Sequence, residues 1–108
     1  MSDTHVRIAA VLMDIEKELR DLLLWQQQPP PPEALASTQP FCIDTLNFAQ
    51  WLQFVFLPRM HQLADAAGAL PQQCGIAPMA EEYFRDLGLN SGELLRQLRL
   101  IDRILSSQ

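Results

Sequence analysis

Histidine and cysteine supply many of the acid–base groups, nucleophiles and metal ligands of proteins, so a search for chemistry begins with them. The sequence contains two of each, namely His5, His61, Cys42 and Cys74. No two of them have the close ligand pairing that is typical of a zinc site, and neither cysteine belongs to a C-x-x-C motif. His5 stands near the N-terminus, where a side chain lacks the fixed position that catalysis requires. We therefore expect no metal centre and no cofactor.

A nucleophilic thiol would need a neighbouring base, and only the two histidines are available. The hydrophobic neighbours of Cys42, which are Phe41 and Ile43, favour burial of a reduced thiol instead. A disulfide between Cys42 and Cys74 stays open as an alternative. The sequence also lacks the phosphate-binding, nucleophile-elbow and H-E-x-x-H motifs of common enzyme classes. We predict that the chain is not an enzyme.

Two groups of residues have the composition of binding surfaces. Aromatic side chains with an arginine are typical of interface anchors, although they are equally typical of a core. The candidate interaction residues are Phe41, Asp44, Trp51, Phe54, Arg59, Met60 and His61. A candidate RNA-binding face is formed by Arg96, Arg99 and Arg103, whose spacing places them on one side of a helix. The alternative for these arginines is a solvated face that pairs with Glu93 and Asp102.

The first element that we predict is a helix over residues 3–24. Apolar residues recur there at alternating steps of four and three, which places them on one face. They are Ile8, Leu12, Ile15, Leu19 and Leu22. A connector over residues 26–32 follows, and its four consecutive prolines favour an extended polyproline conformation. We interpret the connector as a stiff spacer, with docking to an aromatic groove of a partner as the alternative.

A long central helix is predicted over residues 45–67. Its circumference is mostly apolar, which is typical of a helix in the middle of a domain or in an oligomer interface. Asp44 or Thr45 would cap its first turn. Pro58 predicts a kink, because its ring would clash with the carbonyl group of Phe54.

Glycine, asparagine and proline signals divide the rest of the chain. Gly68 would end the central helix in the left-handed conformation, and a short helix is predicted over residues 79–87. A last helix is predicted over residues 91–105, with Asn90 and Glu93 as a capping box. Its buried stripe would consist of Leu94, Leu98, Ile101 and Leu105. These elements together predict an all-α fold, an antiparallel bundle of about four helices.

Composition supports one domain over residues 1–108. Hydrophobic residues make up 48% of the chain, which is enough to form a core. The net charge of −5 disfavours non-specific binding to nucleic acid, because phosphates are repelled at long range. No secretory signal and no segment long enough to cross a bilayer is evident, so we expect a cytoplasmic protein.

Several short motifs occur in a fixed order across the middle of the chain. They are Ser37-Thr38-Gln39-Pro40-Phe41, Asp44-Thr45, Trp51-Leu52-Gln53, Leu57-Pro58-Arg59-Met60-His61, Leu70-Pro71 and Ala77-Pro78. In this order and spacing they resemble the YqcC family of small bacterial proteins, and the resemblance extends over most of the chain. It implies an all-helical bundle and no known activity. The family is associated by name and gene neighbourhood with tRNA pseudouridine synthase C, which implies a link to tRNA modification.

Two functional hypotheses follow. The first is a non-enzymatic protein-interaction module, which self-associates through the apolar central helix as a homodimer or serves a tRNA-modification enzyme. A chain of 108 residues is too short to contain a pseudouridine synthase catalytic domain, so such a role would be accessory. The alternative is an RNA-binding accessory protein that uses Arg96, Arg99 and Arg103.

Overall fold

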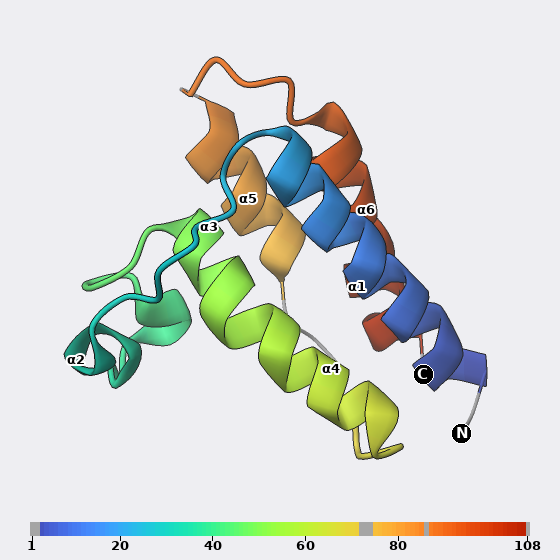
Figure 1. Ribbon diagram of the computed structural model, residues 1–108. Helices are drawn as coiled ribbons and strands as arrows, with labels where there is room; N and C mark the ends of the chain where they lie inside the picture. Colours follow the sequence, from blue (N-terminus) through green and yellow to red (C-terminus); the bar gives the residue numbers. More distant parts are fainter. Residues whose placement is uncertain (1–2, 72–74, 86, 108) are drawn as a thin grey trace.

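The computed structural model describes residues 3–71, 75–85 and 87–107 as an antiparallel helical bundle (Figure 1). Its main helices are α1 (Asp3–Asp21), α4 (Leu57–Asp65), α5 (Ile76–Arg85) and α6 (Gly92–Ser106). Helices α1 and α5 run in one direction, and α4 and α6 run in the other. No strand occurs in the described residues, so the predicted all-α fold is confirmed.

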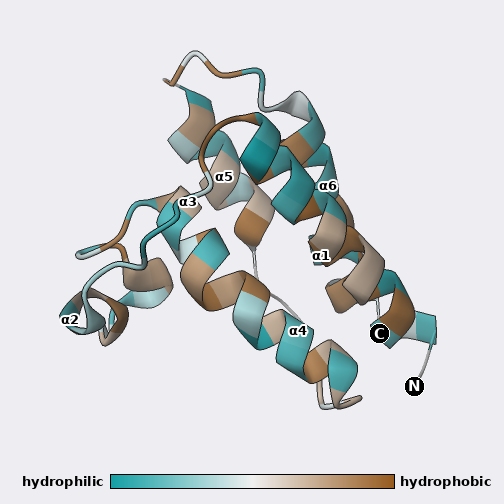
Figure 2. Cartoon of the chain, viewed as in Figure 1, coloured by the Kyte–Doolittle hydropathy of each residue, from teal (hydrophilic) through white to brown (hydrophobic). Residues whose placement is uncertain are grey.

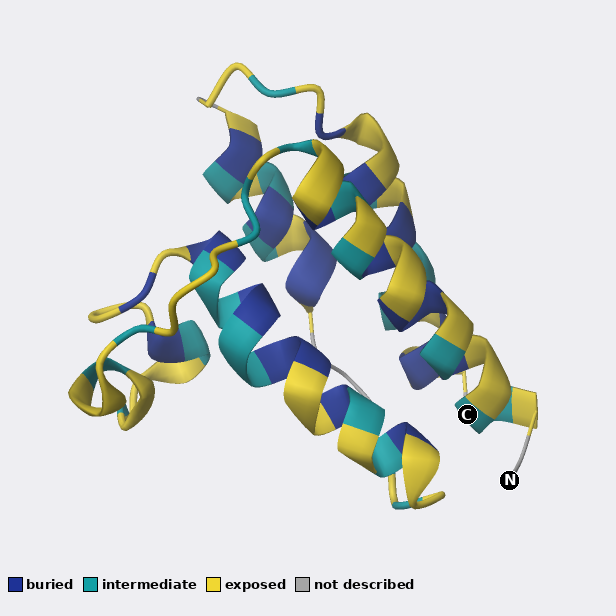
Figure 3. Cartoon of the chain, in the orientation of Figure 1, coloured by how far each residue is buried: buried dark blue, intermediate teal, exposed yellow. Residues whose placement is uncertain are grey.

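The core lies where α1 packs between α4 and α6, and α6 packs in turn against α5. Four residues of the predicted stripe of α1 are confirmed, because Ile8, Leu12, Ile15 and Leu19 are at most 1% exposed. The fifth, Leu22, lies beyond the end of α1 and is partly buried against the core. Figure 3 shows the buried positions of the helices turned toward one another. The predicted stripe of α6 is likewise fully buried, and its members are Leu94, Leu98, Ile101 and Leu105. The outer faces of α1 and α6 are largely hydrophilic (Figure 2).

The central helix changes its geometry just before Pro58. It consists of α3 (Phe48–Trp51), a π-helical turn η2 (Leu52–Phe56) and α4. The amide of Leu57 donates to the carbonyl of Leu52, five residues back. The irregularity expected at Pro58 therefore takes the form of a widened turn, which relieves the crowding that proline imposes on an α-helix.

The central helix begins at a different residue from the predicted one. Asn47, not Asp44 or Thr45, is its cap, and Gln50 completes a capping box. The Asn47 side chain accepts from the Gln50 amide at 2.8 Å, and the Gln50 side chain accepts from the Asn47 amide at 2.9 Å. Thr45 instead donates to the carbonyl of Ala34 at 2.7 Å. The prediction failed because several neighbouring polar residues have the same capping chemistry.

Two helices end on non-glycine residues in the left-handed conformation. We predicted Gly68 for the end of the central helix, but Ala67 adopts it, with φ of 52°. The amide of Gly68 then donates to the carbonyl of Leu63 at 2.8 Å, which closes a Schellman motif. Helix α1 ends at Asp21, three residues before the predicted end, and Leu23 has φ of 62°.

Helices α5 and α6 also differ from prediction at their first residues. Helix α5 begins at Ile76 and ends at Arg85, whereas residues 79–87 were predicted. The predicted capping box of Asn90 and Glu93 is wrong, because Ser91 occupies the cap position without a side-chain hydrogen bond. The start of α5 was missed because its capping group, the carboxylate of Asp102, comes from α6 and not from the residues before α5.

The connector over residues 26–32 runs along the surface and leads into the short helix α2 (Pro32–Leu35). Pro31 has the polyproline-like angles φ −57° and ψ 148°, as expected for this segment. A 3₁₀ turn, η1 (Pro40–Cys42), then turns the chain back toward α3. Phe41 and Cys42 both have positive φ, which places the Phe41 ring against the central helix.

No helix in the described parts of the chain has the length and hydrophobicity needed to cross a membrane.

Candidate functional site

An apolar trough follows the outer face of the central helix. Its first hollow has a volume of about 550 Å³ and is bounded by Phe41 and by residues 69–71. One wall is a stripe of partly exposed residues that recur every four positions, namely Trp51, Val55, Arg59 and Leu63. Beneath the stripe, Phe56 and Met60 are at most 5% exposed and belong to the core. We call this stripe the trough wall.

A second hollow of about 380 Å³ shares Phe41 with the first, and we count both hollows as the trough. Residues Ile43, Leu46 and Phe48 line it on one side, and helix α5 contributes Met79, Glu82 and Tyr83. Helices α4 and α5 are not among the closely packed helix pairs of the described chain. The second hollow therefore lies where the bundle is open between the central helix and α5, whereas the first hollow lies between the central helix and residues 69–71.

Aromatic side chains that line the two hollows contact one another. The rings of Phe41 and Trp51 meet edge to face, with centroids 4.8 Å apart, and Trp51 stacks on Phe56 at 5.4 Å. The rings of Phe48 and Tyr83 lie 5.9 Å apart and connect the central helix to α5. Partial burial raises the pKa of Tyr83. Rigid aromatic side chains that stay partly exposed are typical of interface anchors.

The structure brings together only part of the predicted interaction set. Phe41, Trp51, Arg59 and Met60 line the first hollow. Asp44 lies apart from them and accepts a hydrogen bond from Ser37 at 2.5 Å. Phe54 is partly buried and lines neither hollow of the trough.

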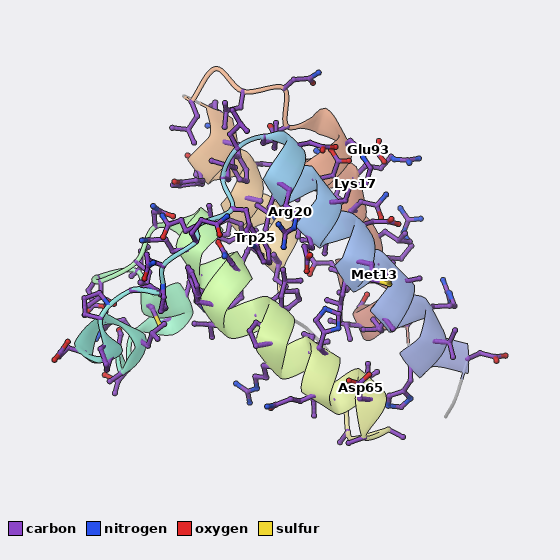
Figure 4. All side chains as sticks on the ribbon, viewed as in Figure 1. Met13, Lys17, Arg20, Trp25, Asp65 and Glu93 are labelled. Carbon is purple, nitrogen blue, oxygen red and sulfur yellow. The ribbon has the colours of Figure 1, made fainter. Side chains whose placement is uncertain are left out.

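His61 lies on a different side of the central helix from Arg59. It lines a third hollow together with α1 residues that include Met13, Lys17 and Arg20. Figure 4 shows these α1 side chains, and beside Arg20 lies Trp25, whose ring centroid is 4.4 Å from the Arg20 guanidinium carbon. None of the three hollows gathers Asp44, Arg59 and His61, so this arrangement supplies no acid–base set.

Sequence reasoning missed two residues of the trough wall. Val55 lies four residues from both Trp51 and Arg59, and Leu63 lies four residues after Arg59. The four-residue repeat was available in the sequence. It was hidden because apolar residues cover most sides of the central helix, so no single face stood out.

The other candidates for chemistry are separated. Cys42 is a buried free thiol, whereas Cys74 lies outside the described residues, and so does their possible pairing. His5 is not in a frayed segment, because it lies within α1 and its Nε2 is 2.8 Å from the carbonyl oxygen of Gly68. The described residues contain no group of three histidine, cysteine or acidic side chains placed to hold a metal ion.

The arginine face of α6 is largely paired. Arg96 forms hydrogen bonds of 2.7 to 3.2 Å with both carboxylate oxygens of Glu93, and Arg99 lies 2.8 Å from Glu81 on α5. The hydrogen bonds from Arg96 and Gln97 lower the pKa of Glu93, and Glu93 in turn raises the pKa of Arg96.

Asp102, which we predicted as a partner of these arginines, instead caps helix α5. Its carboxylate accepts from the backbone amides of Ile76 at 3.2 Å and Ala77 at 2.8 Å.

These features define a small all-helical protein with an open apolar trough. Residues 7–104 match the model of the DUF446 family, which is described as tRNA pseudouridine synthase C. The chain belongs to this family. It is similar to the uncharacterized protein YqcC of Escherichia coli, with 41% identity over 95% of this chain and 94% of that protein. An uncharacterized protein of Haemophilus influenzae is also 41% identical, over 69% of this chain and 71% of its own length.

A third relative is much longer. A segment of 61 residues, or 56% of this chain, is 54% identical to part of a protein of Pectobacterium carotovorum named tRNA pseudouridine synthase C. The match covers 16% of that protein, so most of it lies outside the similarity.

The solution structure of Escherichia coli YqcC has the same fold. It superimposes with a TM-score of 0.84 at 33% identity, over 97% of this chain and 90% of that one. The resemblance to the YqcC family that the sequence motifs indicated is therefore confirmed.

Proposed function

We propose that this chain is a non-enzymatic protein-interaction module whose trough binds a tRNA pseudouridine synthase. The observation that carries the proposal is the trough itself. Partly exposed aromatic and aliphatic side chains line an open seam of the bundle, around the edge-to-face pair of Phe41 and Trp51. Apolar residues that stay accessible in an otherwise packed domain favour a binding surface over an active site.

The choice of partner comes from the relatives. The family description names tRNA pseudouridine synthase C, and a segment similar to this chain occurs within a protein of that name in Pectobacterium carotovorum. When two units are joined in one chain, each is held at high effective concentration near the other. We infer that the separate chain reaches the same neighbour by binding it.

The test is a binding measurement between the purified chain and the tRNA pseudouridine synthase C of the same bacterium, by calorimetry and by size-exclusion chromatography. Val55→Glu places a charge in the middle of the trough wall, and it should weaken binding by at least about tenfold. Val6→Glu is the matched control, because Val6 lies on α1 with 54% exposure and does not line the trough. Thermal denaturation of both variants checks that they fold.

Three outcomes would overturn the proposal. The first is that the synthase does not bind the wild-type chain. The second is that binding disappears after nuclease treatment, which would mean that RNA bridges the two proteins. The third is that Val55→Glu and Val6→Glu bind the synthase equally well. Sedimentation of the chain alone tests whether a second copy of the chain binds the trough instead. A dimer that Val55→Glu dissociates, without any binding to the synthase, would assign the trough to self-association.

A further inference from the structure

We infer that the trough receives an amphipathic α-helix of the partner, oriented by a carboxylate that pairs with Arg59. This inference rests on the proposed function, and it adds the conformation and the charge of the segment that binds. The trough combines a helical wall, exposed apolar surface and an unbalanced charge. Each of these three properties restricts what can bind there.

The shape of the trough favours a helix over an extended peptide. The trough wall belongs to the central helix and α5 lines the second hollow, and the backbone groups of both helices bond within the helices. Residues 69–71 bound the first hollow on its other side. An extended peptide in such a groove would leave its own amide and carbonyl groups without partners, whereas a helix satisfies them internally. A partner helix would also complete the open side of the bundle with the packing that the other helix pairs already use.

The trough wall sets the length of the partner. From Trp51 to Leu63 the central helix rises by about 18 Å, at about 1.5 Å per residue. A facing helix of about three turns covers the first hollow, with apolar anchors that recur at three and four positions, and a longer helix is needed to reach the second hollow as well. Phe41, between the two hollows, would separate the anchors of one end from those of the other.

The charges of the trough set the direction of the partner. Glu82 in the second hollow is already paired with Arg85 at 3.1 Å. Arg59 lines the first hollow, is exposed, and lies in none of the ion pairs among the described residues. The uncompensated charge of the trough is therefore positive and lies at the α4 end. In a net acidic protein, one such charge favours an aspartate or glutamate on the partner at this point and fixes its orientation.

The experiment uses the intact chain and the intact synthase in two steps. Hydrogen exchange of the synthase, with and without the chain, identifies the protected segment. We expect one amphipathic helix that carries an acidic residue. Arg59→Glu should then weaken binding about tenfold, and changing that acidic residue to arginine should restore binding to Arg59→Glu but not to the wild type. Arg103→Glu makes the same charge change on exposed α6, away from the trough, and should leave the affinity unchanged.

The outcomes separate this inference from the proposed function. If the synthase does not bind, the proposed function fails. If it binds and Val55→Glu disrupts binding, but the protected segment is not helical, the inference alone is wrong. The inference alone is also wrong if Arg59→Glu and Arg103→Glu have equal effects on that binding.

Discussion

The side-chain amide of Gln53 bonds to both backbone groups of Gln26. It accepts from the Gln26 amide and donates to the Gln26 carbonyl, each at 2.8 Å. Gln53 lies in the π-helical turn and is only 7% exposed, although it is polar. This pair of hydrogen bonds fixes the start of the proline connector against the central helix.

Replacement of Gln53 tests this contact. Gln53→Ala removes two hydrogen bonds, and each contributes about 0.5 to 1.5 kcal/mol net, so the free energy of unfolding should fall by about 1 to 3 kcal/mol. Gln62→Ala is the control, because Gln62 is an exposed glutamine of the same helical segment, and it should change stability by less than about 0.5 kcal/mol. Urea denaturation measures both variants. Equal stability of the two would show that the contact does not stabilise the fold.

The carboxylate of Asp102 on α6 provides a second prediction, because it accepts from two free amides at the start of α5. Asp102→Ala should lower the free energy of unfolding by about 1 to 2 kcal/mol, through the loss of a cap and of a favourable charge at the helix N-terminus. Asp65→Ala removes an acidic residue from the C-terminal end of α4, where negative charge is unfavourable, so it should be neutral or stabilising. Destabilisation by both variants to the same extent would contradict the capping role.

The left-handed residues Leu23 and Ala67 provide a third prediction. A residue with a Cβ atom pays about 1 to 2 kcal/mol for positive φ, whereas glycine does not. Leu23 is 90% exposed, so its replacement loses little packing. After correction for the greater chain entropy of glycine, Leu23→Gly and Ala67→Gly should each raise the free energy of unfolding by about 0.5 to 1 kcal/mol.

The control for this prediction is Ala66→Gly. Ala66 has φ of −88° and is the neighbour of Ala67, so glycine should destabilise the protein there. The sign of the change is therefore expected to reverse between adjacent positions. Destabilisation at both positions would mean that the left-handed conformation of Ala67 is not strained in solution.

These contacts also show where sequence reasoning succeeded. The apolar stripes of α1 and α6 were predictable except for Leu22, which lies beyond the end of α1, because burial on one side of a helix imposes a repeat of three and four. Local periodicity is enough to determine such features.

The helix boundaries were less predictable because they depend on groups that are distant in sequence. Asp102 lies on α6 and caps the first turn of α5. Ala67 takes the left-handed conformation, which the adjacent Gly68 would adopt more easily. In the site, the sequence identified Phe41, Trp51, Arg59 and Met60, but it could not show that the bundle is open beside α5. That opening depends on how far apart helices pack, which no local pattern encodes.

The fourth prediction concerns pH and Glu93. Hydrogen bonds from Arg96 and Gln97 hold the pKa of Glu93 below the 4.5 of an unperturbed glutamate. Because the folded pKa is the lower one, the stabilisation is fully present above about pH 4.5 and is lost as the pH falls through the folded pKa. Glu93→Gln should therefore melt at a lower temperature than the wild type at pH 7, and the difference should shrink at pH 3.

Thermal denaturation at the two pH values measures this effect, with Glu33→Gln as the control for a generic loss of one carboxylate. Glu33 is exposed in α2 and lies in none of the ion pairs among the residues that the structure describes. A difference between wild type and Glu93→Gln that stays constant with pH would show that the ionised side chain is not the source of the stabilisation.

The last prediction concerns the arginine face of α6 and decides between the two functional hypotheses. Glu93 and Glu81 already neutralise Arg96 and Arg99, so phosphate groups would have to compete with carboxylates held within 2.8 Å. The net charge of −5 adds long-range repulsion. We therefore expect that a chain with all three arginines of the face changed to glutamine binds tRNA no differently from the wild type, within about twofold at low salt.

The double change Glu81→Gln and Glu93→Gln is the complementary variant. It frees the two guanidinium groups, so it should raise tRNA affinity and steepen its dependence on salt concentration. Fluorescence anisotropy with labelled tRNA over a series of salt concentrations measures both effects. If the triple glutamine variant instead loses most of a measurable wild-type affinity, the arginine face is available to RNA, and the alternative of an RNA-binding accessory protein replaces the protein-interaction module.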